Sequence, residues 1–194
     1  MLNYFELTKS KVRRKILAYF FSNIEHELYL REIARLLDED PGNLSKELSK
    51  LEKEHLFSFR FRGNQKYYSL NKEYPLFKEI KSVVFKTIGI EGLLRDLVAY
   101  SAGVNVAFIY GSYANSTENT YSDIDLCLII DNNIFNDDTF IAEINKIEKA
   151  ILRDIEYIYY SEDEWNKKIK LQDSFILNLI SKPKIVLAGE LPGL

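Results

Sequence analysis

The stretch FIYGSYANSTENTYSDIDLCLII, Phe108 to Ile130, joins two apolar runs through a polar connection. The first run ends at the pair Gly111-Ser112, and the second begins with Asp123 and Asp125 at alternate positions. Apolar runs of this length, bounded by turn-forming residues, predict two strands. Because side chains alternate between the two faces of a strand, the two carboxylates should lie on one face, close together.

Two neighbouring carboxylates repel each other, and a bound cation relieves that repulsion. A set of oxygen ligands favours Mg²⁺ or Mn²⁺ over zinc. An isolated Asp-x-Asp pair is equally typical of a solvated strand start. The upstream glycine favours the metal interpretation, because it permits a sharp turn, and a short helix over residues 112–116 would present N–H groups to an anion. The stretch thus predicts phosphate and metal binding at the ends of two consecutive strands.

The sequence beyond this stretch alternates between helical and extended patterns. Residues 153–160, RDIEYIYY, predict a third strand, and residues 161–181 predict one helix capped by Ser161 with Glu164 in a capping box. Strands interleaved with helices indicate an α+β domain in which helices flank a small mixed sheet. Residues 140–152 predict an amphipathic helix with Ile141, Ile144, Ile147 and Ile151 along one side.

The first third of the chain has a different pattern, of helices followed by a hairpin. Helical periodicity covers residues 10–23 and 30–37, and DEDPGN then interrupts it, with Asp40 as the expected N-cap and Pro41 at the first helical position. The next helix should bury Leu44, Leu48 and Leu51. After it, FSFRFRGNQKYYSL alternates aromatic and polar residues around Gly63-Asn64, which predicts a β-hairpin.

This order resembles a winged helix-turn-helix over residues 8–71, and LREIARLLDEDPGNLSKELSKLEKEHLF resembles the reading heads of small bacterial and archaeal regulators. The resemblance implies that the second helix of the motif enters the major groove of double-stranded DNA and that the hairpin contacts the backbone. The alternative is a winged helix used only for dimerisation or protein docking, and a homodimer is expected. By this likeness Asn43, Ser45, Lys46 and Ser49 face bases, and Lys50, Arg60, Arg62 and Lys66 face phosphates.

The spacing Gly-Ser, ten residues, Asp-x-Asp inside apolar strands resembles the nucleotidyltransferase superfamily that includes DNA polymerase beta, above all its minimal members. The resemblance implies catalysis and metal binding by Asp123, Asp125 and a third carboxylate. Glu156 aligns best with that third position, where the family usually has Asp, and Asp154 lies on the same face. Nucleotide-binding residues would be Gly111, Ser112, Tyr113 and Ser122. Many relatives carry Arg-Gly where this chain has Asn115-Ser116, so a cation is missing beside the triphosphate.

The implied activity is Mg²⁺-dependent transfer of a nucleoside monophosphate from ATP or another NTP to an acceptor, coupled to DNA binding. Minimal members resemble the antitoxin half of systems that modify a toxin, so a partner protein is the expected acceptor; a small molecule or an RNA end is the alternative. A second hypothesis is a transcriptional regulator whose nucleotidyltransferase domain only senses nucleotide. A third is an interaction scaffold that binds neither nucleotide nor DNA.

Length and composition agree with a folded protein of one large domain or two small ones. The chain has 194 residues, of which 46% are hydrophobic and 28% charged, enough to bury a core. Its net charge is −3, with an excess of basic residues in the first 75 positions and of acidic residues after them. One cysteine and no signal or membrane-spanning pattern predict a cytoplasmic protein without a membrane partner. The expected domains are residues 1–73 and 101–194, with connecting helices over 74–100.

Overall fold

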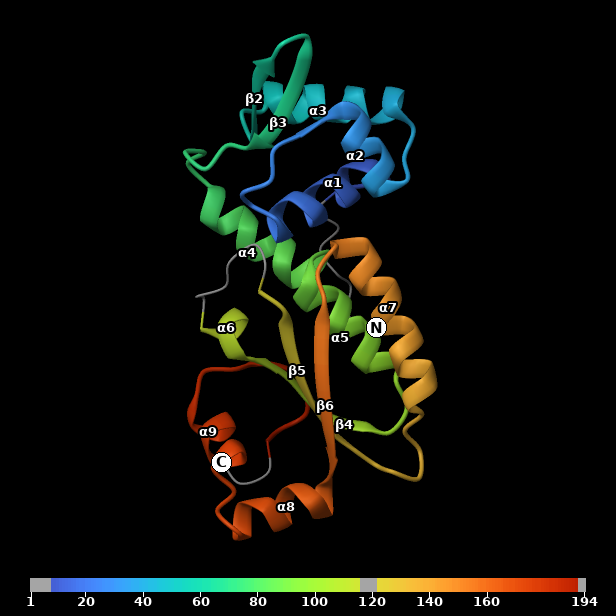
Figure 1. Cartoon of the computed structure of the whole chain (residues 1–194), viewed down its shortest axis with the longest axis vertical. Coiled ribbons are helices and arrows are strands. Elements are labelled where there is room, and N and C mark those ends of the chain that lie inside the picture. The colour runs from blue at the N-terminus through green and yellow to red at the C-terminus, as the bar shows by residue number, and fades with distance from the viewer. Residues whose placement is uncertain (1–7, 116–121, 192–194) are drawn as a thin grey trace. The chain divides into compact units, whose positions relative to one another are not determined.

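A computed structural model of the chain describes residues 8–115 and 122–191 (Figure 1). The chain divides into two compact units, Met1–Gly92 and Leu93–Leu194. Of the two helices expected to connect the domains, α4 (Phe77–Thr87) belongs to the first unit, and most of α5 (Ile90–Tyr100) belongs to the second. None of the described helices has the length and apolar character needed to cross a membrane.

The first unit has the element order of a winged helix-turn-helix, as predicted. Its helices are α1 (Lys11–Ser22), α2 (Leu30–Leu37), α3 (Pro41–Lys53) and α4. Its sheet has the order β1-β3-β2 and is antiparallel throughout, with β2 (Phe57–Arg62) and β3 (Gln65–Leu70) forming the predicted hairpin. The strand β1 (Leu28–Tyr29) was not predicted, because two residues give no periodicity to detect.

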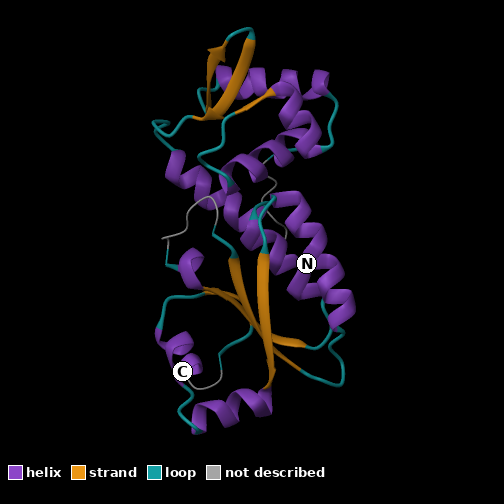
Figure 2. Cartoon of the chain, viewed as in Figure 1, coloured by secondary structure: helices purple, strands orange, loops and turns teal. Residues whose placement is uncertain are grey.

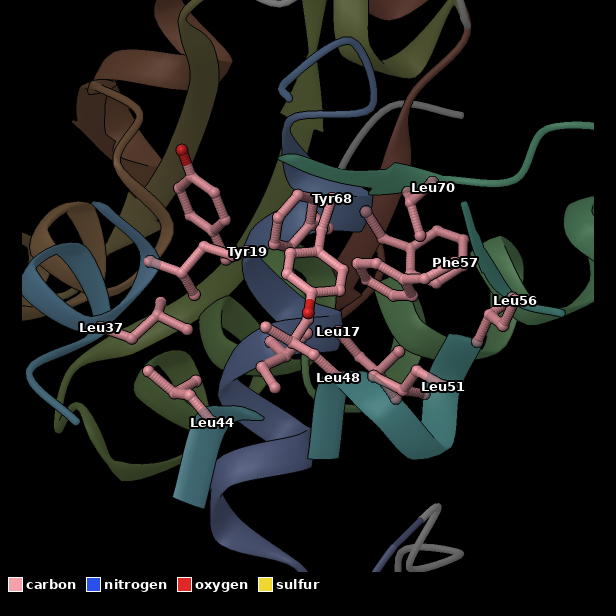
Figure 3. Packing of buried hydrophobic residues seen from close by; sticks show 14 of the residues in the cluster. Leu17, Tyr19, Leu37, Leu44, Leu48, Leu51, Leu56, Phe57, Tyr68 and Leu70 are labelled. Atoms are coloured by element: carbon pink, nitrogen blue, oxygen red, sulfur yellow. The ribbon is translucent and has the colours of Figure 1, made fainter. Parts of the chain in front are cut away.

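Apolar faces of the three N-terminal helices and of the hairpin form one core. The predicted face of α3, with Leu44, Leu48 and Leu51, is fully buried, and Figure 3 shows it beneath the hairpin residues Phe57 and Tyr68. Burial of such side chains contributes roughly 1.5–3 kcal/mol each. The core therefore fixes α3 and the hairpin relative to each other within this unit.

The start of α3 and the hairpin turn follow the local chemistry that the sequence indicates. The carboxylate of Asp40 accepts a hydrogen bond of 2.9 Å from the backbone N–H of Asn43, and Pro41 occupies the first turn, where it sacrifices no helical hydrogen bond. Gly63 has φ +59°, a conformation that the tight turn requires and glycine tolerates. Both predictions are confirmed.

The second unit contains the predicted mixed sheet (Figure 2). Strand order is β6-β5-β4-β7, with β5 (Ile124–Ile130) parallel to β6 (Ile155–Ser161) and antiparallel to β4 (Val104–Tyr110). The strand β7 (Ile185–Ala188) pairs antiparallel with β4 and was not predicted. The fold class expected from the sequence, α+β with two parts, is confirmed.

Different helices cover the two faces of this sheet (Figure 1). On one face, Phe140 of α7 (Asp137–Ile151) packs against Tyr157 of β6, with ring centroids 5.2 Å apart. On the other face, Trp165 of α8 (Glu162–Lys170) and Ile176 of α9 (Ser174–Ser181) pack against Phe108 and its neighbours. The middle of β4 and most of β5 are therefore buried, whereas β6 keeps half-buried and exposed residues.

Two predictions for the helices of the second unit were wrong. Ile141 is 45% exposed, and Phe140 takes its place on the buried side of α7, because the apolar stripe of this helix begins one residue earlier. The helix expected over 161–181 is broken into α8 and α9, and Gln172 between them has φ +53°. Its predicted start is confirmed, since Ser161 and Glu164 form the capping box.

Candidate functional site

Three strand ends meet at one end of the sheet in the second unit. Because β4 runs antiparallel to β5 and β5 parallel to β6, the last residue of β4 lies beside the first residues of the other two strands. The register pairs Tyr110 with Asp125 and Asp125 with Glu156. Paired residues share a face of the sheet, so these three side chains form one row. Asp123 precedes the row by two residues and should share its face.

The predicted turn at Gly111 comes into direct contact with this row. Gly111 has φ +71° and opens α6 (Gly111–Ala114), the short helix predicted after the first strand. A β-carbon at Gly111 would lie 2.1 Å from Oδ2 of Asp125, so any other residue would displace this carboxylate and strain the backbone. The backbone N–H and the side-chain amide of Asn115 both donate to the Gly111 carbonyl, at 3.2 and 2.8 Å. The position of the turn and the position of the Asp125 carboxylate therefore depend on each other.

The row concentrates negative charge around a partly buried carboxyl. Burial raises the pKa of Asp125, and the negative charges of Glu156 and Asp123 raise it further. Asp123 and Glu156 are themselves exposed. Asp125 is thus the group whose ionised form needs a compensating cation most.

The donor set fits a hard divalent cation. In residues 8–115 and 122–191, no group of three or more His, Cys, Asp or Glu side chains is drawn together tightly enough to hold an ion. Asp125 and Glu156 nevertheless lie opposite each other, and the side chains of Asp123 and Glu156 are exposed. All three offer carboxylate oxygens, the ligands that Mg²⁺ and Mn²⁺ prefer.

The remaining predicted nucleotide-binding residues lie around the same turn. Ser112 is half-buried, and Tyr113 is 7% exposed, with its ring in the interior of the unit. Ser122 comes immediately before Asp123, and Ser116, the second residue of the departure from Arg-Gly, lies outside the described residues. Their contacts with a nucleotide remain predictions.

Arg153 is a residue of this site that the sequence did not single out. It is 7% exposed, and its Nη2 donates a hydrogen bond of 2.7 Å to the Ser122 carbonyl. It therefore fixes the backbone directly before Asp123. The sequence showed it only as the first residue of the third predicted strand, and its contact across 31 positions depends on the parallel pairing of β5 and β6.

The predicted DNA-facing residues lie on α3 and the hairpin of the first unit. Asn43, Lys46 and Lys50 are exposed on α3, whereas Ser45 and Ser49 are half-buried. On the hairpin, Arg60 and Arg62 are exposed and Lys66 is half-buried. The fold brings these residues to the two elements that a winged helix presents to DNA.

Each cation assigned to phosphate contact is already paired with a carboxylate. Arg60 and Arg62 both donate to Oε2 of Glu27, and the Arg62 guanidinium lies 4.7 Å above the Tyr67 ring. Lys66 pairs with Glu52 at 2.5 Å, and Lys50 pairs with Glu47 at 2.6 Å. Phosphates would have to compete with these carboxylates, so DNA binding remains a proposal.

Comparison with known families identifies the class of the second unit. Residues 94–185 match the family model described as Polymerase beta, Nucleotidyltransferase, so this part of the chain is a polymerase beta-type nucleotidyltransferase domain. The match spans the three strand ends, the Gly-Ser turn and the carboxylates. Residues 4–54 match the family model described as EarA-like. No curated protein sequence matches the chain.

Three solved structures are similar at low identity. Reduced HlyU from Vibrio cholerae N16961 is 23% identical over 39% of this chain and 70% of its own, with a TM-score of 0.31. A toxin–antitoxin structure with AMP-PNP is 15% identical over 52% of this chain and 73% of its own, with a TM-score of 0.38. Lactococcus lactis ZitR, a C30AH42A mutant, is 21% identical over 48% and 63%, with a TM-score of 0.36.

Proposed function

We propose that the chain is a Mg²⁺-dependent nucleotidyltransferase that moves a nucleoside monophosphate from an NTP, ATP in the first instance, to a hydroxyl of a partner protein. The observation that carries the proposal is the contact between Gly111 and Asp125, inside a row of carboxylates at the strand ends of a nucleotidyltransferase domain. Enzymes that transfer groups from a triphosphate need a backbone turn that binds the phosphates and carboxylates that hold metal ions.

The residues of the site divide between phosphate binding and metal binding in this reaction, and Glu156 also acts as the base. The turn at Gly111 and Ser112 holds the β- and γ-phosphates, and Asp123, Asp125 and Glu156 are the ligands for Mg²⁺. Bound Mg²⁺ would supply positive charge that stabilises the triphosphate and makes the acceptor hydroxyl more acidic.

The transfer step itself requires one proton acceptor and an in-line approach. Glu156 takes the proton of the acceptor hydroxyl, whose oxygen attacks the α-phosphorus. The bond between the α-phosphorus and the bridging oxygen breaks, and pyrophosphate leaves with the electron pair. The product is an acceptor that carries the nucleoside monophosphate on its oxygen.

The choice of acceptor and the DNA function have separate support. A protein acceptor, for which a toxin is the model, rests on the resemblance to minimal nucleotidyltransferases. Binding of double-stranded DNA by the first unit, as a homodimer, rests on the winged helix-turn-helix order and on the exposed cations of α3 and the hairpin. Coupling of the two activities would link nucleotide chemistry to gene regulation.

A second candidate function is nucleotide sensing without transfer. The observation that favours it is Asn115, which stands where relatives have an arginine and uses its amide to hold the Gly111 carbonyl. An interaction scaffold is the third possibility, and it predicts a melting temperature unaffected by ATP and Mg²⁺, since a ligand of the folded state raises apparent stability.

The position of the radioactive label in ATP separates these functions. The purified protein is incubated with Mg²⁺, cell extract and ATP labelled at either the α- or the γ-phosphate. Transfer to a protein acceptor is expected from α-labelled ATP alone, and Asp123→Asn and Asp125→Asn should abolish it. Glu162→Gln, which removes an exposed carboxylate just beyond the other end of β6, should leave transfer intact.

The remaining outcomes identify the alternatives. ATP binding without transfer, together with DNA affinity that changes with ATP, would favour the sensor. Transfer from γ-labelled ATP would indicate a kinase and overturn the nucleotidyltransferase proposal. Absence of both ATP binding and DNA binding would favour the scaffold.

A further inference from the structure

An exposed aromatic ring contacts Tyr110, the residue that pairs with Asp125 across the strand ends. Phe175 lies in the first turn of α9 and is 47% exposed. On the same helix, Ile176 and Leu179 are buried. Its ring meets the ring of Tyr110 edge to face, with centroids 6.4 Å apart and planes at 85°. The core of the unit does not require this exposed ring, since Ile176 and Leu179 already anchor the helix.

Tyr110 connects Phe175 to the candidate site. It is the last residue of β4, directly before Gly111, and it pairs with Asp125, which in turn pairs with Glu156. Contacts therefore run from the exposed ring through Tyr110 to the predicted metal ligands Asp125 and Glu156.

The backbone of Phe175 is held in place before any ligand arrives. The Asp173 carboxylate caps α9 by accepting from the backbone N–H groups of Phe175 and Ile176, both at 3.1 Å. Lys168 holds the same carboxylate at 3.2 Å. A binding surface that is fixed in advance loses less conformational entropy when its ligand binds.

We propose that Phe175, supported edge to face by Tyr110, is the platform on which the nucleobase of the NTP stacks. The inference deepens the proposed function and rests on it, because the base is placed by a triphosphate bound at Gly111 and the carboxylates. A nucleobase presents a flat π-face attached to a highly charged tail, which matches an exposed ring at the end of a row of metal ligands. Stacking of a base on an aromatic ring is tolerant of base identity, so the platform predicts affinity more than choice among bases.

The test compares two ligands that share the triphosphate and differ in the base. Binding of ATP and of inorganic tripolyphosphate, each with Mg²⁺, is measured by calorimetry. Phe175→Ala should weaken ATP binding about tenfold, within the range of roughly 5- to 150-fold expected for loss of one stacking ring, and should leave tripolyphosphate binding unchanged. Phe175→Trp should retain ATP binding.

Leu177→Ala is the matched control. Leu177 is 42% exposed and lies on the same helix, two residues away. This variant should bind both ligands like the wild type. Both alanine variants should keep a melting temperature close to that of the wild type, because both side chains are exposed.

Three results would overturn the platform. Equal ATP binding by Phe175→Ala and wild type, with slower transfer to the acceptor, would show that the ring contacts the acceptor instead. Equal weakening of ATP and tripolyphosphate would show that the substitution distorts the phosphate site. If the wild type binds neither ligand, both the proposed function and the platform are wrong. If the wild type and Phe175→Ala bind ATP equally well, only the platform is wrong.

Discussion

Oδ2 of Asp125 occupies the space that a β-carbon on Gly111 would need, only 2.1 Å from its ideal position. The glycine directly follows β4, the carboxylate lies on β5 after a long polar connection, and the antiparallel register of the two strands brings them together. The side chain that is proposed to hold the metal therefore packs directly on the turn that is proposed to hold the phosphates. A change at either residue should disturb both functions.

Gly111→Ala should abolish binding of ATP with Mg²⁺ while the protein stays folded. The positive φ adds strain of about 1–2 kcal/mol, and the new methyl group forces the Asp125 carboxylate away from its position. Calorimetry and thermal melting measure the two effects. Gly63→Ala is the control, since Gly63 also has positive φ but has no atom within 4 Å of the added carbon. It should cost similar stability and leave ATP binding unchanged; equal loss of ATP binding in both variants would contradict the prediction.

Glu27→Gln should strengthen binding of double-stranded DNA if the first unit binds it. Glu27 accepts from both Arg60 and Arg62, so phosphates must displace its carboxylate to reach them. Exposed ion pairs contribute about 0.2–1 kcal/mol each, so release of two arginines should raise affinity about two- to thirtyfold at low salt. Fluorescence anisotropy with a labelled duplex at several salt concentrations measures the change.

The control for this prediction is Glu25→Gln, which removes the same charge two residues away. Glu25 pairs with Lys72 at 2.6 Å and contacts neither wing arginine. It should change affinity only slightly, through overall charge. Equal strengthening by both variants would show that Glu27 acts through long-range charge and does not mask the arginines.

Glu47→Gln should lower the free energy of unfolding of the first unit by about 1–2 kcal/mol at pH 7, because Glu47 joins Lys50 at 2.6 Å and Arg13 at 3.0 Å in a mostly buried position. The Lys50 contact, followed by Arg13, lowers the pKa of Glu47 in the folded protein. A lowered pKa stabilises the fold above the unfolded-state pKa, and this contribution disappears as the pH falls through the folded-state pKa.

Urea unfolding at several pH values checks this prediction. The difference between Glu47→Gln and wild type should shrink as the pH falls below about 4.5, the ordinary pKa of a glutamate. Glu25→Gln breaks an exposed ion pair with the same distance of 2.6 Å between its charged atoms. It should lower the free energy of unfolding by at most a few tenths of a kcal/mol at any pH. A difference that persists unchanged into acid would mean that Glu47 contributes through packing.

Periodicity and capping chemistry were sufficient to predict most of the fold. The buried leucines of α3, the Asp40 cap and the Ser161 capping box are local signals, and the structure has each of them. The break between α8 and α9 could not be predicted, because Gln172 adopts positive φ without the glycine that usually marks such a turn. The strand β7 was missed because its four residues are defined only by pairing with β4, far away in the sequence.

Some residues of the candidate site could likewise be predicted from the sequence, and others could not. Gly111, Asp123 and Asp125 belong to one local motif, and their spacing was sufficient to predict a shared site. Arg153 and Phe175 lie later in the chain, and they reach the site only through the pairing of β5 with β6 and the packing of α9 on Tyr110. Such residues carry no local signal, so only the tertiary structure shows them.

The proposed transfer reaction depends most on a metal ion shared between the nucleotide and the three carboxylates. Electron paramagnetic resonance with Mn²⁺ counts the bound ions directly, with and without AMP-PNP as a non-hydrolysable nucleotide. The wild type should bind Mn²⁺ tightly only when the nucleotide is present, and Asp125→Asn and Glu156→Gln should each lose that binding, whereas Glu162→Gln should retain it. Nucleotide-dependent Mn²⁺ binding that survives in Asp125→Asn, or its absence in the wild type, would contradict the proposed site.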